Sequence, residues 1–185
     1  MIEQINGYFN KLKSTLDHLD RKEIEQFINV LNKARENGNQ IFIMGNGGSA
    51  STASHFCCDF NKGACYGFVD KKRFKFICLN DNVPTMMAYS NDISYDDVFV
   101  EQLKNFLQPN DVVIGISGSG NSKNVIKAIE YANANRALTM GLTGYSGGKL
   151  RELAKYTVNA NINDMQVSED IHMILCHMIM QLVSK

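Results

Sequence analysis

The chain has 185 residues, the size of one domain, and this length is enough to bury a continuous core. Its 19 basic and 19 acidic side chains give no formal net charge, so neither a nucleic-acid-binding surface nor a polybasic membrane-binding segment is indicated. Five cysteines, an odd number without a C-x-x-C pair, argue against a disulfide framework and favour a reduced, cytoplasmic setting. With neither a signal-peptide pattern nor an apolar run near the roughly 20 residues that span a bilayer, we expect a soluble protein whose partner is a small molecule.

Residues 3 to 36 carry apolar side chains at helical spacing, and the sequence DRKE interrupts the pattern, so one long helix or two helices are predicted there. From this point on, short apolar runs alternate with helical patterns. The strands are predicted at 41–44, 74–79, 112–117, 138–143 and 156–160. The helices that follow them are predicted at 49–61, 83–90, 95–107, 122–135, 147–155 and 165–184.

This alternation predicts an α/β fold with a mostly parallel sheet, because parallel neighbours need crossover connections, and with helices on both faces. The sequence contains no internal repeat, low-complexity tract or linker. We therefore expect a single domain over 1–185, in which an N-terminal helical segment at 1–36 serves oligomerisation and precedes an α/β core at 37–185.

In such a sheet, ligands bind at the carboxyl ends of strands, where the winding direction changes. Two turns at such places have an unusual composition: GNGGSAS at 45–51 and GISGSGNSKN at 115–124. Serine hydroxyls and the free N–H groups of a helix N-terminus attract an anion, so the second turn is a candidate phosphate site. The ordinary alternative is that Ser122 caps a helix and the glycines only form turns. Neither turn has the Walker spacing or the G-x-G-x-x-G pattern, which argues against a nucleotide cofactor.

Histidines and carboxylates supply candidate acid–base groups. His55 and Asp59 are four residues apart and share one helix face. Glu169 and His177 lie on the last predicted helix, roughly 80° apart around its axis and about 12 Å apart along it, so both can approach one site. His172 lies about 140° around the axis from His177 and is not expected to face the same cavity. The alternative for each histidine is packing in the core.

Four segments together carry a family resemblance: GNGGSASTASHF, GISGSGNSKNVIKAI, GLTGYSGG and SEDIHMILCHMIMQL. In order and spacing they resemble the phosphoheptose isomerases, the sedoheptulose 7-phosphate isomerase branch of the sugar isomerase (SIS) domain superfamily. The resemblance implies a five-stranded parallel sheet in a flavodoxin-like three-layer α/β/α arrangement, and a homotetramer with sites near subunit interfaces. It also implies conversion of D-sedoheptulose 7-phosphate to D-glycero-D-manno-heptose 7-phosphate, a precursor of surface heptoses, through an enediol.

The resemblance also assigns roles to individual positions. Phosphate binding falls on Ser117, Gly118, Ser119 and Ser122. Sugar binding falls on Asn46, Gly47, Ser49 and Asp92. His55 and His177 fall on positions that ligate metal in zinc-containing family members, and with the carboxylates of Asp59 and Glu169 they form a candidate zinc-binding set. The candidate catalytic residues are Asp59, His177 and Glu169.

The sequence departs from the family pattern at several of these positions or beside them. A family glutamate is Asp59 here, one methylene shorter, and a family glutamine is Glu169, so the base is either of these two carboxylates. A family arginine falls on Gly63, with Lys62 beside it, and a family aspartate falls on Gln166. A fully ligated metal would leave no free base, so metal binding and base catalysis compete.

Two classes of function stay open at this point. The first is an isomerase of a phosphorylated heptose or a related ketose phosphate. The second is a non-catalytic member that binds a phosphosugar or a protein, as in the branch that binds the bacterial replication initiator. His55 and His177 with nearby carboxylates favour the isomerase, because a binding module has no need of an acid–base pair.

Overall fold

Five parallel strands form the centre of the molecule. The structure is a computed structural model that describes residues 1–67 and 72–184. In spatial order the strands are β2 (Phe76–Cys78), β1 (Ile41–Gly45), β3 (Val112–Ser117), β4 (Leu138–Gly144) and β5 (Tyr156–Ala160). All neighbouring pairs are parallel, and β1 pairs with both β2 and β3, so the winding direction reverses between β1 and β3. The predicted parallel sheet is confirmed, although β2 is shorter than the predicted 74–79.

The helices around the sheet follow the predicted pattern closely. They are α1 (Ile2–His18), α2 (Arg21–Asn37), α3 (Gly48–Asn61), α4 (Val83–Asp92), α5 (Val98–Phe106), α6 (Lys123–Ala134), α7 (Gly148–Leu153) and α8 (Met165–Val183), with 3-10 turns η1 (Gly63–Cys65) and η2 (Tyr95–Asp97). The N-terminal segment forms two helices rather than one. The Asp20 carboxylate accepts from the backbone N–H groups of Lys22 and Glu23 and so starts α2.

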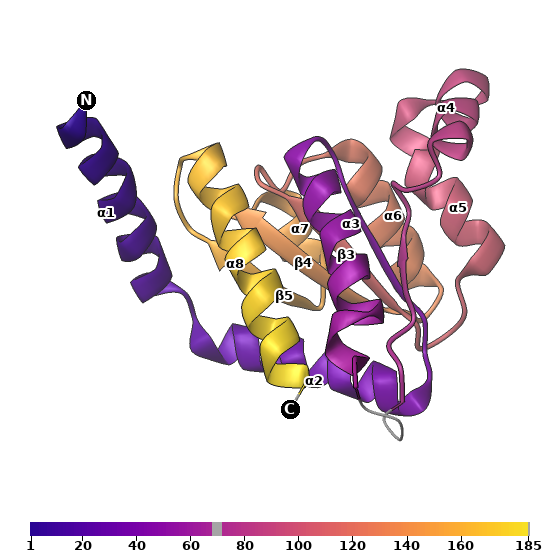
Figure 1. The fold of residues 1–185 in the computed structure, drawn as a ribbon. Coiled ribbons are helices and arrows are strands. Elements are labelled where there is room, and N and C mark those ends of the chain that lie inside the picture. The colour runs from indigo at the N-terminus through magenta and orange to yellow at the C-terminus, as the bar shows by residue number, and fades with distance from the viewer. Residues whose placement is uncertain (68–71, 185) are drawn as a thin grey trace.

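Helices cover both faces of the sheet, which gives the expected three layers (Figure 1). Along β1 the side chains alternate between the faces. Ile41 and Ile43 pack with α2, α3 and α8, whereas Phe42 and Met44 pack with α5, α6 and α7. Every residue of β1 and β3 is buried, as expected for central strands with helices on both sides. Within the described ranges, no helix has the length and apolar character needed to cross a membrane.

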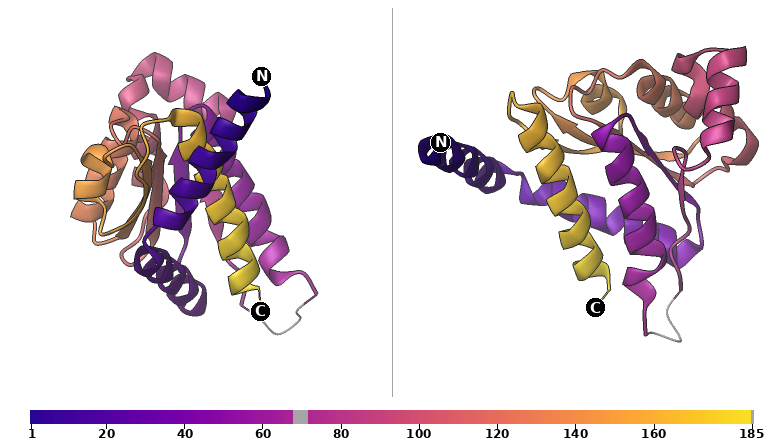
Figure 2. Two further views of the ribbon diagram at one scale, coloured as in Figure 1. Left: turned by 90° about the vertical axis from the view of Figure 1, so that its left-hand side faces the viewer. Right: turned by 45° about the horizontal axis from the view of Figure 1, so that its top comes forward.

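The first helix, α1, lies apart from the sheet and rests on α8 (Figures 1 and 2). Tyr8 Oη donates to Asp170 Oδ2 at 2.6 Å, and Lys11 Nζ pairs with Asp164 Oδ2 at 3.1 Å. These contacts attach one side of α1 to α8. The large apolar side chains that α1 exposes include Ile2, Ile5 and Phe9.

Candidate active site

The carboxyl ends of β1 and β3 meet where the sheet reverses its winding. Gly45 pairs with Ile116 in the register, so the turns that follow the two strands start side by side. A cavity of about 310 Å³ lies between these turns and the start of α8. The predicted site residues that line it are Asn46, Gly47, Ser49, Ser117, Gly118, Ser119, Ser122 and Glu169. Such a switch point is the usual ligand site of an open parallel sheet.

The hydroxyls of the serine turn after β3 contact one another and the turn itself. Ser117 Oγ lies 3.0 Å from Ser122 Oγ, and Ser119 Oγ accepts from the N–H of Asn121 at 3.2 Å. Ser122 occupies the N-cap position of α6, yet its side chain makes no capping hydrogen bond. Gly120 has a φ of +68°, which favours glycine, and a Cβ there would collide with a backbone oxygen of the neighbouring turn. Ser122 therefore occupies the cap position without a side-chain capping hydrogen bond, and it lines the cavity.

Glu169 reaches the same cavity from the beginning of α8. Its carboxylate lies against Gly48, the first residue of α3, so closely that a Cβ on Gly48 would collide with Glu169 Oε2. A carboxylate at a helix N-terminus is stabilised by the helix dipole. Glu169 brings negative charge to the α3 side of the cavity, so the serine side is less repulsive toward an anion.

A second cluster lies further along α3 and α8, which pack against each other (Figure 1). His55 Nε2 is 2.9 Å from His177 Nε2, so one imidazole donates and the other accepts. Asp59 Oδ2 lies 3.4 Å from His55 Nε2 and 3.9 Å from His177 Nε2. Two imidazoles and a carboxylate therefore converge on one point, where both imidazoles are partly exposed to solvent.

These three residues form a group that could hold a metal ion. The ligand atoms of His55, Asp59 and His177 all lie within 4.8 Å of one another. Two imidazole nitrogens and one carboxylate oxygen are a donor set that zinc accepts, and they leave a fourth coordination position open. Glu169, the fourth candidate zinc ligand, lies against Gly48 and is not part of this group.

Two other residues singled out in the sequence lie outside both clusters. His172 is buried, its Nε2 lies 3.1 Å from the backbone oxygen of Thr143, and burial lowers its pKa to about 4. His177 therefore joins the cluster without His172, as the helical spacing predicts. Asp92 ends α4, is exposed, and accepts from Asn91 Nδ2 at 2.8 Å. It is not among the residues that line the cavity.

Two residues next to the cavity are missed by the sequence analysis. Asn124 Nδ2 and Tyr95 Oη contact Asn46 Oδ1 at 2.9 and 2.8 Å. The sequence could have indicated Asn124 as a site residue, because it lies two residues after Ser122, in the first turn of the helix that follows the serines. No pattern marks Tyr95, which lies 49 residues from Asn46 in the sequence.

Comparisons with known proteins identify the family. Residues 7–144 match the family described as SIS domain. A phosphoheptose isomerase of Helicobacter pylori is 34% identical over 174 residues, which cover 94% of this chain and 88% of that protein. The chain belongs to the phosphoheptose isomerase family of SIS-domain proteins. A second relative, the phosphoheptose isomerase of Crocosphaera subtropica, is 36% identical over 162 residues, 88% of this chain and 81% of the relative.

A solved structure of this isomerase family has the same fold. The phosphoheptose isomerase from Neisseria gonorrhoeae matches with a TM-score of 0.89 at 26% identity, and the match covers 98% of this chain and 97% of that one. The fold, the family and the enzyme class expected from the sequence are therefore confirmed.

The residues at which the resemblance indicates a departure from the family, Lys62, Gly63 and Gln166, lie at the end of α3 and the start of α8. At Gly63, an added Cβ would lie 3.6 Å from Met180 Sδ. Lys62 directs its ammonium over the ring of Tyr66, 5.9 Å from the centroid. Gln166 is exposed at the start of α8.

Proposed function

We propose that this family member is an aldose–ketose isomerase that converts D-sedoheptulose 7-phosphate to D-glycero-D-manno-heptose 7-phosphate. The observation that carries the proposal is the convergence of His55, His177 and Asp59 on the same two helices that border the serine cavity. The relatives supply the substrate class, since those of Helicobacter pylori and Crocosphaera subtropica are named phosphoheptose isomerases. An acid–base cluster next to a phosphate cavity is the combination that such a reaction requires.

The two clusters are spaced along α3 and α8 so that one substrate can use both. From Gly48 to His55 the rise along α3 is about 10 Å, and from Glu169 to His177 the rise along α8 is about 12 Å. An open-chain sugar phosphate can thus keep its phosphate at the serine turn while its opposite end reaches the histidines. A substrate of this length is favoured over a small phosphorylated triose.

Phosphate recognition in this proposal belongs to the turn after β3. The hydroxyls of Ser117, Ser119 and Ser122 donate to phosphate oxygens, and the N-terminus of α6 adds the favourable end of its dipole. The carboxylate of Glu169 opposes an anion at the α3 side of the same cavity, which keeps the phosphate next to the serines.

Isomerisation requires a proton to leave C1 of the ketose and a proton to arrive at C2, with an enediol between the two steps. Asp59, in the histidine cluster, takes the carbon proton from a sugar in this position, and Glu169 is the alternative base for a sugar whose C1 lies at the start of α8. His177, positioned by the contact with His55, serves the sugar oxygens as acid and base, because an imidazole exchanges protons near neutral pH. Zinc, if bound by His55, Asp59 and His177, would polarise the sugar oxygens.

We also propose a homotetramer in a cytoplasmic setting, with sites near the subunit interfaces. The exposed apolar side chains of α1 support the assembly. The described cysteines are all free thiols, namely Cys57, Cys58, Cys78 and Cys176, and they support a reduced compartment.

Incubation with ketose phosphates in deuterated water tests the proposed reaction. Isomerisation through an enediol leaves solvent deuterium at C2 of the product, even where the equilibrium is unfavourable. We expect incorporation with sedoheptulose 7-phosphate and less with fructose 6-phosphate or ribulose 5-phosphate. The His177→Ala variant, which keeps the serine turn, is the control that should bind inorganic phosphate but incorporate no deuterium.

Two outcomes of the deuterium experiment would contradict parts of the proposed function. Incorporation with a shorter ketose phosphate only would contradict the heptose substrate. Binding of sugar phosphates by the parent chain without deuterium incorporation from any of them would contradict the isomerase and assign a non-catalytic, phosphosugar-binding role.

A further inference from the structure

A reciprocal pair of amide hydrogen bonds holds the turn after β1 against α6. Asn46 Nδ2 donates to Asn124 Oδ1 at 2.9 Å, and Asn124 Nδ2 donates to Asn46 Oδ1 at 2.9 Å. Asn124 lies in the first turn of α6, and only 2% of its surface is exposed. A buried amide needs partners for its polar atoms, so the pair fixes both side chains and the two segments that carry them.

A backbone donor decides which way round the two amides face. Asn124 Oδ1 accepts from the N–H of Val125 at 2.9 Å, and a backbone nitrogen can only donate. The oxygen of Asn124 must therefore face this N–H, which leaves Asn124 Nδ2 as the donor to Asn46 Oδ1. With Asn46 Oδ1 fixed as an acceptor, Tyr95 Oη, 2.8 Å away, is its second donor.

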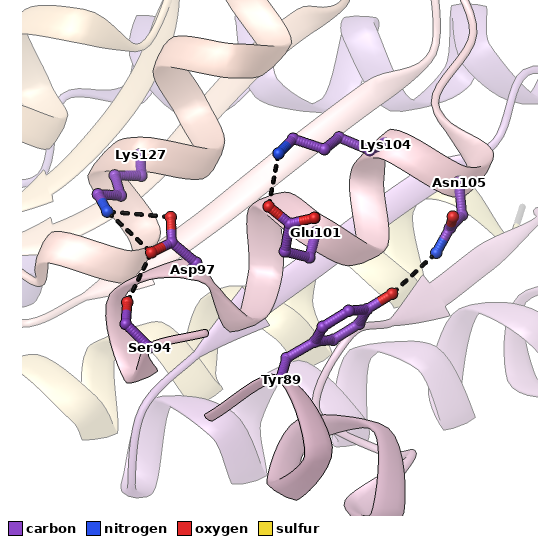
Figure 3. A network of polar contacts seen from close by, with 7 residues as sticks. All are labelled: Tyr89, Ser94, Asp97, Glu101, Lys104, Asn105 and Lys127. Atoms are coloured by element: carbon purple, nitrogen blue, oxygen red, sulfur yellow. Dashed lines mark hydrogen bonds and ion pairs between the residues drawn. The ribbon is translucent and has the colours of Figure 1, made fainter. Parts of the chain in front are cut away.

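Tyr95 belongs to η2, and η2 is attached to the same helix, α6. Ser94 Oγ donates to Asp97 Oδ2 at 2.6 Å, and Lys127 Nζ contacts both carboxylate oxygens of Asp97 at 2.9 and 3.1 Å (Figure 3). The Ser94 hydroxyl and the Lys127 ammonium lower the pKa of Asp97 and so favour its charged form. Because Lys127 follows Asn124 by three residues, one helix positions both partners of Asn46.

We propose that Asn124 and Tyr95 are positioning residues of the sugar site, which orient Asn46 so that it offers the ligand one N–H donor and no acceptor. Asn124 and Tyr95 together occupy both lone pairs of Asn46 Oδ1. Of the two hydrogens on Asn46 Nδ2, the hydrogen bonds of the described residues use one, and Asn46 lines the cavity. The inference rests on the proposed function, because it takes the ligand to be an open-chain sugar phosphate.

The fixed orientation has a consequence for recognition. An amide that could turn over would offer a ligand hydroxyl either a donor or an acceptor, whereas the fixed Asn46 offers only a donor to a ligand oxygen. Loss of the orientation should therefore weaken contacts with the sugar more than contacts with the phosphate, which the serines of the other turn hold.

Calorimetric binding to the full chain tests the role of Tyr95. The probes are inorganic phosphate and glucitol 6-phosphate, an open-chain sugar phosphate that has no carbonyl group and cannot isomerise. We expect Tyr95→Phe to weaken glucitol 6-phosphate binding about threefold to tenfold, the effect of one hydrogen bond, and to change phosphate binding less than about twofold. The matched control is Tyr89→Phe, which removes a hydroxyl that contacts Asn105 at 3.2 Å in the neighbouring network (Figure 3) and should change neither affinity.

A double-mutant cycle separates positioning from direct contact. If Tyr95 acts through Asn46, Tyr95→Phe should cause no further loss of glucitol 6-phosphate affinity in an Asn46→Ala background. Additive losses in the double variant would overturn the proposal, since Tyr95 would then act on the ligand independently of Asn46.

The side-chain amide NMR signals of Asn46 provide a readout that needs no ligand. We expect them to shift in Tyr95→Phe and in Asn124→Leu but not in Tyr89→Phe. Unchanged Asn46 signals in Tyr95→Phe would overturn the positioning role, and this result does not depend on which substrate the enzyme converts. If the variants behave as expected but the parent chain incorporates no deuterium from any ketose phosphate, the isomerase activity is contradicted and the positioning role of Asn124 and Tyr95 stands.

Discussion

The carboxylate of Asp59 stops 3.4 Å from His55 Nε2 and 3.9 Å from His177 Nε2. Both separations exceed the ~2.9 Å of a usual hydrogen bond, and glutamate has a reach one methylene longer. We expect Asp59→Glu to keep or raise activity on the heptose phosphate. If Asp59 is the base, Asp59→Asn should lower kcat on the order of 100-fold or more, because no carboxylate remains to take the carbon proton. Steady-state kinetics on purified variants measure both changes.

Glu169→Gln is the matched variant for this comparison, since it removes the charge of the other candidate base and keeps its length. Full activity of Asp59→Asn together with an inactive Glu169→Gln would show that Glu169 is the base.

His177→Ala should abolish isomerisation while it spares phosphate binding, because the serines lie on a different turn. If all of these variants are as active as the parent, the proposed active site is wrong.

His172 should make the stability of the protein depend on pH. Burial lowers its pKa from 6.5 to about 4. Between these pH values the imidazole binds a proton in the unfolded chain but not in the folded chain. The contribution of neutral His172 to the free energy of unfolding is therefore fully present above pH 6.5 and is lost as the pH falls toward 4. The contribution amounts to about 3 kcal/mol over this range. Urea denaturation at pH 7.5, 6, 5 and 4 measures it.

Two histidine variants isolate the contribution of His172 from that of the acidic groups. We expect the free energy of unfolding of His172→Gln to fall less steeply with decreasing pH than that of the parent. His18→Gln, which replaces an exposed imidazole on α1, is the control substitution of a histidine. Identical slopes for His172→Gln and the parent would contradict a neutral, buried His172.

At the level of elements, we expect the serine hydroxyls of the turn after β3 to bind phosphate together. Ser119→Ala and Ser122→Ala should each weaken the binding of phosphorylated sugars by roughly 1–3 kcal/mol, because each leaves a charged oxygen without its hydrogen-bond donor. Calorimetric titration with sugar phosphates measures the loss. Non-phosphorylated sugars should bind these variants as they bind the parent, and unchanged affinity for sugar phosphates in both variants would contradict the assignment of this turn.

The central strands are predictable from the sequence, whereas the boundary of α5 is not. The strands at 41–45 and 112–117 are apolar runs buried on both faces, and such runs identify themselves by composition. The predicted helix at 95–107 is divided into η2 and α5. Its first turn is held by the contacts of Asp97 with Ser94 and Lys127. A contact with α6 depends on tertiary packing and leaves no mark in a local apolar pattern.

For the molecule as a whole, the sequence predicts which groups surround the site better than how they face one another. The serine turn and the turn at Asn46 follow neighbouring parallel strands, so their proximity is deducible from the fold. The amide pair of Asn46 and Asn124 joins residues 78 positions apart, and no spacing rule anticipates it. Likewise, helical spacing predicts that Glu169 and His177 can approach one site, about 12 Å apart along α8. In the structure Glu169 lies against Gly48 and is not part of the histidine cluster.

The N-terminal helix supplies the reason to expect an oligomer. Contacts of Tyr8 and Lys11 attach one side of α1 to α8. Ile2, Ile5 and Phe9, spaced by three and four residues, form an apolar stripe whose side chains are 74%, 47% and 53% exposed. Exposed apolar stripes of this kind mark interaction surfaces, and symmetric self-association is the common way to cover them. We therefore expect a tetramer by light scattering at micromolar concentration.

Charge placed within this apolar stripe should separate the subunits. Phe9→Asp buries a carboxylate in the expected interface, which is costly without a partner, so the variant should scatter as a species smaller than the parent. Asn10→Asp adds the same charge one residue further on, about 100° around the helix, and should keep the parent assembly. A parent chain that is monomeric at micromolar concentration would contradict the tetramer and, with it, any site completed by a second subunit. A parent assembly that Phe9→Asp leaves intact would show instead that the subunits meet through a surface other than α1.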